Sequence, residues 1–228
     1  MTIPEGTTQA QIFEMLEKAG VSTVKDLTET AANYDFKFSF LKGVLPLGDA
    51  KRLEGYLFPD TYEFYMGEDP VSVLNKMIRF DQIFTEEMRQ TMAAQGKTIN
   101  DAVIIASMIE KETDGGDQGK ISSVIYNRLD KPTSETAGYL NIDATILYAT
   151  GGTTVDLNAD TPYNTRTHKG LPPTAICCPG ADALKAAVSP ESTNYYFYAL
   201  GDHGVHHFFT NYNQHQNFIA SQELYKHD

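Results

Sequence analysis

Two glutamates end an apolar stretch of the chain, "DAVIIASMIEKET" at residues 101–113. A carboxyl group at the end of a mostly buried helix is a candidate proton donor, because desolvation raises its pKa. At 100° per residue, Glu110 and Glu112 diverge by about 200°, so they cannot share a helix face. Glu112 stacks over bulky apolar residues, whereas Glu110 stacks over small ones such as Ala106 and Ser107, which leave room for a ligand. The helical pattern therefore favours Glu110 as the acid.

The same spacing leaves another interpretation open. Both glutamates could lie on the surface of the last helical turn and pair with Lys111 or Lys120, because most carboxylates in proteins titrate near their ordinary pKa. A helix C-terminus disfavours negative charge, and this raises the pKa of an acid placed there. Spacing makes Glu110 the better candidate without making it catalytic.

Composition and charge bound what the chain can be. Its 228 residues are 41% hydrophobic, which is ample for a buried core in one large domain or two small ones. The formal net charge of −12, with no basic face, argues against a nucleic-acid ligand. The longest apolar run, "AVIIASMI", is far shorter than the roughly 20 residues that cross a bilayer, and no export signal opens the chain. We therefore expect no membrane span within this sequence, and we expect the adjacent Cys177 and Cys178 to be free, buried thiols.

Capping residues and periodicity predict helices mixed with short strands. Asp69 followed by Pro70 is typical of a helix start, and "YYFYAL" with "VHHFFT" predicts a β-hairpin about a polar turn. Without a regular βαβ repeat, the fold class is α+β. The predicted helices cover approximately residues 8–19 with Thr7 or Thr8 as the cap, a short piece from about 22, then 70–96, 98–113, 119–130, 144–149 and 181–190, with a last one from 212.

Five motifs occur in the order in which one known family carries them. They are "EGYLFPDTYEF", "ASMIEKET", "SSVIYNRL", "YNTR" with "GLPPTAICCPGADALKAAVSP", and "YYFYAL" with "HHFFTN". Together they resemble the endolytic murein transglycosylases, the YceG-like (MltG) family. The resemblance implies a mixed helical catalytic domain with a short antiparallel hairpin over residues 54–228. Residues 1–53 would form a small α/β segment adjoining a LysM-like portion.

The resemblance also implies an activity. Family members cleave the β-1,4 bond between N-acetylmuramic acid (MurNAc) and N-acetylglucosamine (GlcNAc) in peptidoglycan and form 1,6-anhydroMurNAc ends, without a cofactor. The resemblance also implies that the first glutamate of "EKE", Glu110, is the catalytic acid. A hydrolytic muramidase that uses the same acid, and a peptidoglycan-binding module without turnover, remain alternatives.

Further site residues follow from the matching motifs. Asp143 could equally cap the following helix, and Asn164 could be a turn asparagine that bonds its own backbone. In Arg166 the chain carries a charge where the family usually shows an aromatic residue, and Asn141 stands where glutamine is usual. The expected substrate-binding residues are Tyr163, Asn164, Asn141, Asp143, Thr145, Arg166 and Glu54, and the expected supporting residues are Glu112, Arg128 and His206.

The histidines of "DHGVHHFFTNYNQH" suggest zinc at first sight. In a strand of period two, however, His206 and His207 face opposite sides, so we predict no metal site. The expected partner is the glycan strand, with cell-wall synthesis enzymes by analogy. Family members are anchored by an N-terminal helix, absent from this chain, at the extracytoplasmic face of the bacterial cytoplasmic membrane. The resemblance therefore implies that this chain is a soluble ectodomain fragment.

Overall fold

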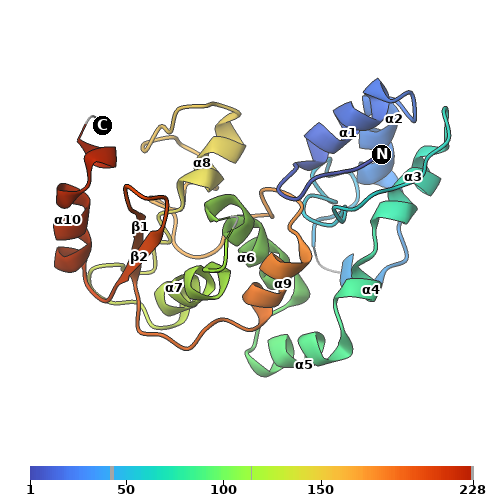
Figure 1. Ribbon diagram of the computed structural model, residues 1–228. Coiled ribbons are helices and arrows are strands. Elements are labelled where there is room, and N and C mark those ends of the chain that lie inside the picture. Colours follow the sequence, from blue (N-terminus) through green and yellow to red (C-terminus); the bar gives the residue numbers. More distant parts are fainter. Residues whose placement is uncertain (42–43, 114, 227–228) are drawn as a thin grey trace. The chain divides into compact units, whose positions relative to one another are not determined.

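The computed structural model describes residues 1–41, 44–113 and 115–226. Within these residues helices alternate with loops, and one two-stranded antiparallel sheet lies near the C-terminal end (Figure 1). The predicted α+β class is confirmed. The helices are α1 (Gln9–Lys18), α2 (Val24–Asn33), η1 (Ser39–Leu41), α3 (Pro70–Met77), α4 (Phe80–Ile83), α5 (Glu86–Ala94), α6 (Ile99–Glu112), α7 (Gln118–Asp130), α8 (Asp143–Thr150), α9 (Ala181–Val188), α10 (Tyr212–Ser221) and η2 (Glu223–Tyr225).

The chain forms two compact units, each built from two segments of sequence. Unit 1 comprises residues 1–111 and 173–188, and unit 2 comprises residues 112–172 and 189–228. The expected division after residue 53 falls inside unit 1. There Glu54 accepts a hydrogen bond of 2.9 Å from the backbone N–H of Gln9, so the chain is continuous in packing across that point. Residues 54–228 as a catalytic domain stay a prediction.

Unit 1 contains α1 to α5, α9 and all of α6 except its last residue. The α1 helix starts at a capping box in which Thr8 and Gln11 satisfy each other's backbone N–H groups. Thr98 and Asp101 form the same reciprocal arrangement at the start of α6. Every residue from 102 to 109 is buried, so α6 is the core helix that the sequence predicts.

The single long helix expected over residues 70–96 is wrong. The chain forms α3, α4 and α5 in its place, although Asp69 caps and Pro70 opens α3 as predicted. The helix stops at Ile78, whose ψ of 80° leaves the helical region, and α5 begins where the Thr85 side chain accepts a hydrogen bond from Met88. The periodicity concealed these breaks because apolar residues are buried in both α3 and α4.

Unit 2 is built around the hairpin of β1 (Phe197–Leu200) and β2 (His206–Phe209). The strands pair antiparallel with Leu200 opposite His206, which confirms the predicted hairpin. The α10 helix packs on both strands, and α7 packs against β1. His207 faces α10, where its ring lies 4.4 Å from that of Phe218. His206, one residue earlier, therefore points to the other side of the hairpin.

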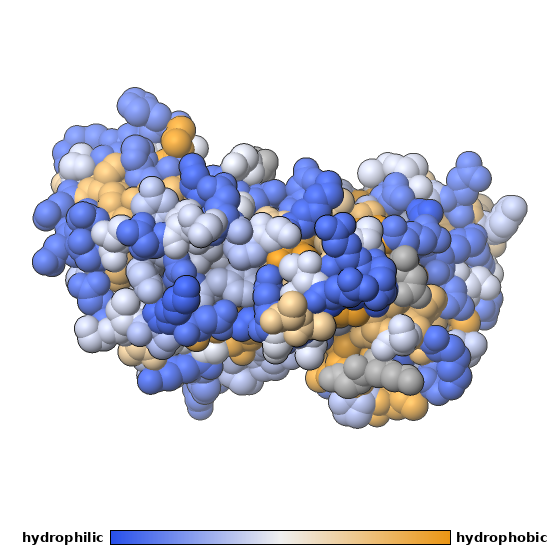
Figure 2. Space-filling model, turned by 90° about the horizontal axis from the view of Figure 1, so that it is seen from below, coloured by the Kyte–Doolittle hydropathy of each residue, from blue (hydrophilic) through white to orange (hydrophobic). Residues whose placement is uncertain are grey.

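The surface is that of an acidic, well-solvated chain. Hydrophilic side chains cover much of the face seen in Figure 2, interrupted by apolar patches. No helix within the described parts of the chain is long and apolar enough to cross a membrane. Cys177 and Cys178 are both free and fully buried, as predicted.

Candidate active site

A cavity of about 490 Å³ lies in unit 2 and gathers most of the polar residues singled out in the sequence. The end of α6, the start of α8, the hairpin and α10 all contribute to its wall. Its lining includes Glu112, Arg128, Asn141, Asp143, Arg166, Tyr198, His206, Tyr212 and His215. This cavity is therefore the place where those residues could act together on a ligand.

Glu112, the last residue of α6, provides a carboxyl group to this cavity. The hydroxyl of Tyr198 donates a hydrogen bond of 2.7 Å to its Oε2. Burial raises the pKa of Glu112 above its ordinary value, and the negative charge of Asp143 acts in the same direction. The hydrogen bond from Tyr198 and the positive charges nearby oppose this rise without cancelling it. Glu112 is thus suited to hold a proton and to give it up inside the cavity.

Asp143 and Arg166 form a two-pronged ion pair in the same cavity. The Arg166 Nε lies 2.6 Å from Asp143 Oδ1, and Nη2 lies 3.0 Å from Oδ2. The alternative role of Asp143 as an N-cap is wrong, because Ile142 occupies the cap position and Asp143 is the first residue of α8. The paired geometry fixes the direction of both side chains.

Asn141 reaches the cavity through an unusual backbone conformation. Its φ of 54° lies in the left-handed region, which costs a residue other than glycine of order 1 kcal/mol. Its N–H donates to the Thr165 carbonyl at 3.2 Å, and the next N–H donates to the Thr165 hydroxyl at 2.9 Å. Thr145, expected to bind substrate, is fully buried and donates its hydroxyl to Ile142 instead. It supports the loop behind the cavity.

The structure places Tyr163 and Asn164 behind the cavity wall. Asn164 is 0% exposed, and its amide Nδ2 donates to the carbonyls of Leu157 and Ala159, both at 3.0 Å. Its Oδ1 accepts the N–H of Arg166 at 3.0 Å. These contacts are those of a turn asparagine, the alternative that the sequence left open. Tyr163 is also buried and does not line the cavity.

Glu110 lies in unit 1 and is not part of this cavity. Its Oε2 accepts the N–H of Gly180 at 3.0 Å, and burial raises its pKa, with the charge of Glu5 adding to the rise. The room above the small residues of α6 is filled by protein, since the N–H of Ile176 donates to the Ser107 hydroxyl at 3.0 Å. The pKa is therefore raised at both Glu110 and Glu112, but of the two only Glu112 lines the polar cavity.

Of the other expected residues, Arg128 lines the cavity and Glu54 does not. Glu54 is 4% exposed, bonded to Gln9, and does not line the cavity. Arg128 does line it, and donates through Nε to the Tyr196 carbonyl at 2.7 Å and through Nη1 to the Leu140 carbonyl. Its charge acts on Glu112 across the cavity.

Sequence reasoning missed Tyr198 and Asp117. Tyr198 lies in the motif "YYFYAL". Strand alternation would have placed its side chain on the same face of the hairpin as one of the two neighbouring histidines. Nothing in the sequence marked it as the hydrogen-bond partner of Glu112. Asp117 lies 2.7 Å from the Nδ1 of His206, 89 residues away in sequence, so only the fold could reveal the contact. Among the residues that the structure describes, no group of three or more His, Cys, Asp or Glu could hold a metal ion.

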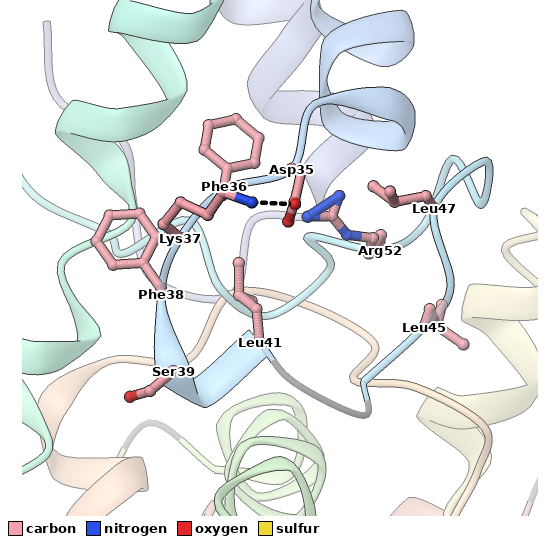
Figure 3. A pocket seen from close by; sticks show the side chains of 9 residues that line it. All are labelled: Asp35, Phe36, Lys37, Phe38, Ser39, Leu41, Leu45, Leu47 and Arg52. Carbon is pink, nitrogen blue, oxygen red and sulfur yellow. Dashed lines mark hydrogen bonds and ion pairs between the residues drawn. The ribbon is translucent and has the colours of Figure 1, made fainter.

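A second cavity, also of about 490 Å³, lies in unit 1 and contains none of the expected site residues (Figure 3). Leu41, Leu45 and Leu47 form much of its wall. Arg52 donates there to the carbonyls of Ala31 and Tyr34 at the end of α2, which gives it a structural role. The arrangement offers no candidate acid or base comparable with Glu112.

Comparisons with known proteins find curated relatives of this chain. An endolytic murein transglycosylase of Bacillus subtilis (strain 168) is 35% identical over 159 residues, covering 67% of this chain and 43% of the relative. One of Streptococcus pneumoniae (strain D39) is 29% identical over 246 residues, covering 96% and 44%. This chain thus spans less than half the length of these curated relatives.

A solved structure and a family model also match nearly the whole chain. The crystal structure of a YceG-like protein from Listeria monocytogenes superposes with a TM-score of 0.79 at 29% identity, covering 95% of this chain and 74% of that one. The model of the YceG-like family matches residues 1–221. The chain belongs to the YceG-like family.

Proposed function

We propose that this chain is the catalytic part of an endolytic lytic transglycosylase that cleaves the MurNAc-β-1,4-GlcNAc bond of peptidoglycan glycan strands. The observation that carries the proposal is the carboxyl group of Glu112, which has a raised pKa and is held by a tyrosine hydroxyl at the wall of a polar cavity. Glu112, and not the Glu110 favoured by the sequence, is the proton donor in this proposal.

The reaction needs one acid and no external nucleophile. Protonated Glu112 donates its proton to the glycosidic oxygen as the bond from the muramyl C1 breaks. The 6-hydroxyl of the same muramyl residue then attacks C1 and forms the 1,6-anhydro ring, so that no water is consumed. An intramolecular nucleophile is already close to the reacting carbon, and a single carboxyl that later takes the hydroxyl proton could suffice.

The remaining cavity residues fit supporting roles around this step. Asn141 offers both a donor and acceptors for the acetamido group or a hydroxyl of a sugar. The Asp143 charge keeps Glu112 protonated to higher pH, while Arg166 holds that carboxylate in place.

One observation favours a second candidate, a hydrolytic muramidase. Asp143 is another carboxylate in the cavity of Glu112, and most glycosidases use two. However, both of its oxygens accept hydrogen bonds from Arg166, so Asp143 would have to give up one of these bonds to take a proton from water. We therefore place hydrolysis second.

The two reactions differ by one water in the product. Purified peptidoglycan is digested with the protein, and the released muropeptides are weighed and treated with borohydride. We expect products that end in 1,6-anhydroMurNAc, which borohydride does not reduce. They are about 18 Da lighter than hydrolytic products, because no water is added. Such products would support the lyase. Reducible ends would support the muramidase, and in that case Asp143→Asn should abolish them.

The setting of the reaction is also a proposal. Peptidoglycan as the substrate follows from the names of the relatives. A LysM-like portion next to residues 1–53, an N-terminal anchor at the extracytoplasmic face of the cytoplasmic membrane, and cell-wall synthesis enzymes as partners are proposed from the family alone. Co-purification of the full-length protein with membranes, lost when the anchor is removed, would test the location.

A further inference from the structure

Asp117 and His206 form a hydrogen-bonded couple beside Glu112 that the proposed reaction does not yet use. The Nδ1 of His206 lies 2.7 Å from Asp117 Oδ2, and the other carboxylate oxygen accepts the Thr113 hydroxyl at 2.5 Å. Only 12% of the His206 side chain and 22% of that of Asp117 are exposed. The couple is therefore an ordered part of unit 2.

The charge state of Asp117 determines which ring nitrogen of His206 carries the hydrogen. Burial tends to raise the pKa of Asp117, but hydrogen bonds from Thr113 and His206 outweigh it and leave the pKa below its ordinary value. An ionised carboxylate only accepts hydrogen bonds, so Nδ1 of His206 must donate. In the neutral imidazole, Nε2 then has a free lone pair.

That lone pair belongs to a residue of the cavity wall. His206 lines the cavity together with Glu112 and Tyr198, and its ring lies edge-on to the Tyr198 ring with centroids 5.8 Å apart. Within the described parts of the chain, the hydrogen bond of His206 is the one that Nδ1 makes. Nε2 thus remains available to a ligand that donates a hydrogen bond, such as a sugar hydroxyl.

We infer that His206, oriented by Asp117, accepts the proton of the muramyl 6-hydroxyl through Nε2, so that this proton has an acceptor separate from Glu112. The inference rests on the proposed transglycosylase function. His206 is then a catalytic residue of that reaction, and Asp117 a positioning residue.

The step balances without water or a redox partner. The O6–H bond breaks, its proton goes to Nε2, and the electron pair on O6 forms the C1–O6 bond. The bond from C1 to the leaving oxygen breaks, and that oxygen takes the proton of Glu112. His206 ends as imidazolium and Glu112 as carboxylate, and transfer of one proton from the first to the second through solvent restores the starting state.

The role given to His206 predicts a loss of rate when its ring is replaced. General base catalysis contributes about 10²–10⁴-fold, so His206→Gln should lower kcat by at least roughly 10²-fold while KM changes little.

The control is the adjacent histidine. His207 is on the same strand, is exposed and faces α10, so His207→Gln should keep the wild-type kcat and KM. A His206→Gln enzyme whose kcat is within a few-fold of wild type would overturn the inference. If wild type itself yields no anhydro products, the proposed function fails instead, and the two failures are thereby distinguished.

A measurement without turnover protects against a variant that does not fold. Nitrogen NMR of histidine-labelled wild-type protein should show that the neutral ring of His206 carries its hydrogen on Nδ1 and not on Nε2. Asp117→Asn should disturb this tautomer and lower kcat, because an amide can also donate to Nδ1. Protonation at Nε2 in the wild type would refute the role given to the couple.

Discussion

The hydrogen bond from Tyr198 to Glu112 gives the sharpest quantitative prediction. Tyr198→Phe removes the hydroxyl that lies 2.7 Å from Glu112 Oε2 but keeps the ring that contacts His206 and Phe208. Hydrogen bonds to charged groups contribute about 1.5–3 kcal/mol and neutral ones about 0.5–1.5, so the bond favours the carboxylate over the acid by about 1–1.5 kcal/mol. Its loss should weaken the dissociation of Glu112 by roughly tenfold.

The assay is the pH dependence of kcat for anhydromuropeptide release. Because Glu112 must be protonated to act, its ionisation sets the alkaline limb, and Tyr198→Phe should move that limb to higher pH. Tyr196→Phe is the matched control, since the Tyr196 hydroxyl donates to the carbonyl of Lys131 and not to Glu112. An alkaline limb that stays in place, or moves to lower pH, would show that the tyrosine-bound carboxyl is not the titrating acid.

The free energy of unfolding should also depend on the protonation of Glu112. The raised pKa means that folded Glu112 binds more protons than unfolded Glu112 between its ordinary and its folded pKa. The free energy of unfolding therefore falls as the pH rises through that window. In Tyr198→Phe the carboxylate is less stabilised, so this fall should be larger, and thermal unfolding at a series of pH values measures it. Equal pH dependence in both proteins would contradict the assignment.

Three further substitutions test the surroundings of the site. Arg166→Lys should lower kcat with little change in melting temperature, because lysine cannot make both bonds to Asp143 and the pair is partly exposed; an unchanged kcat would contradict the role of the pair. Ser107→Ala should lower the free energy of unfolding in urea by about 1–3 kcal/mol, because the buried N–H of Ile176 loses its acceptor, whereas a loss below about 0.5 would argue against this contact. Gly55→Ala should cost about 2–5 kcal/mol in the same assay, since φ is +87° and the added Cβ would lie 2.5 Å from another side-chain carbon; a near-neutral result would refute the tight packing.

Local sequence signals predicted much of the fold. The caps predicted at Thr7 or Thr8 and at Asp69 mark real helix starts, the first of them at Thr8. The alternation around His206 and His207 predicted both the hairpin and the separation of the two rings. The breaks between α3, α4 and α5 were hidden, because a helix that ends and restarts while its apolar residues remain buried keeps much of its periodicity.

The choice between the two glutamates could not be made from the helix alone. Small residues under Glu110 were interpreted as space for a ligand, but the same space admits backbone, and the segment at Ile176 to Gly180 fills it. Glu112 looked structural because it stacks over a bulky stripe, yet it lies at the helix end, where residues distant in sequence complete the cavity. Its partners Tyr198 and His206 come from more than 80 residues further along the chain.

The most direct test of the account compares the two acids side by side. Peptidoglycan is digested with wild type, Glu110→Gln and Glu112→Gln at equal concentrations of folded protein, and the anhydromuropeptides are quantified by mass spectrometry. The account predicts products from wild type and Glu110→Gln and none from Glu112→Gln. Products from Glu112→Gln together with none from Glu110→Gln would contradict it and return the proton donor to Glu110.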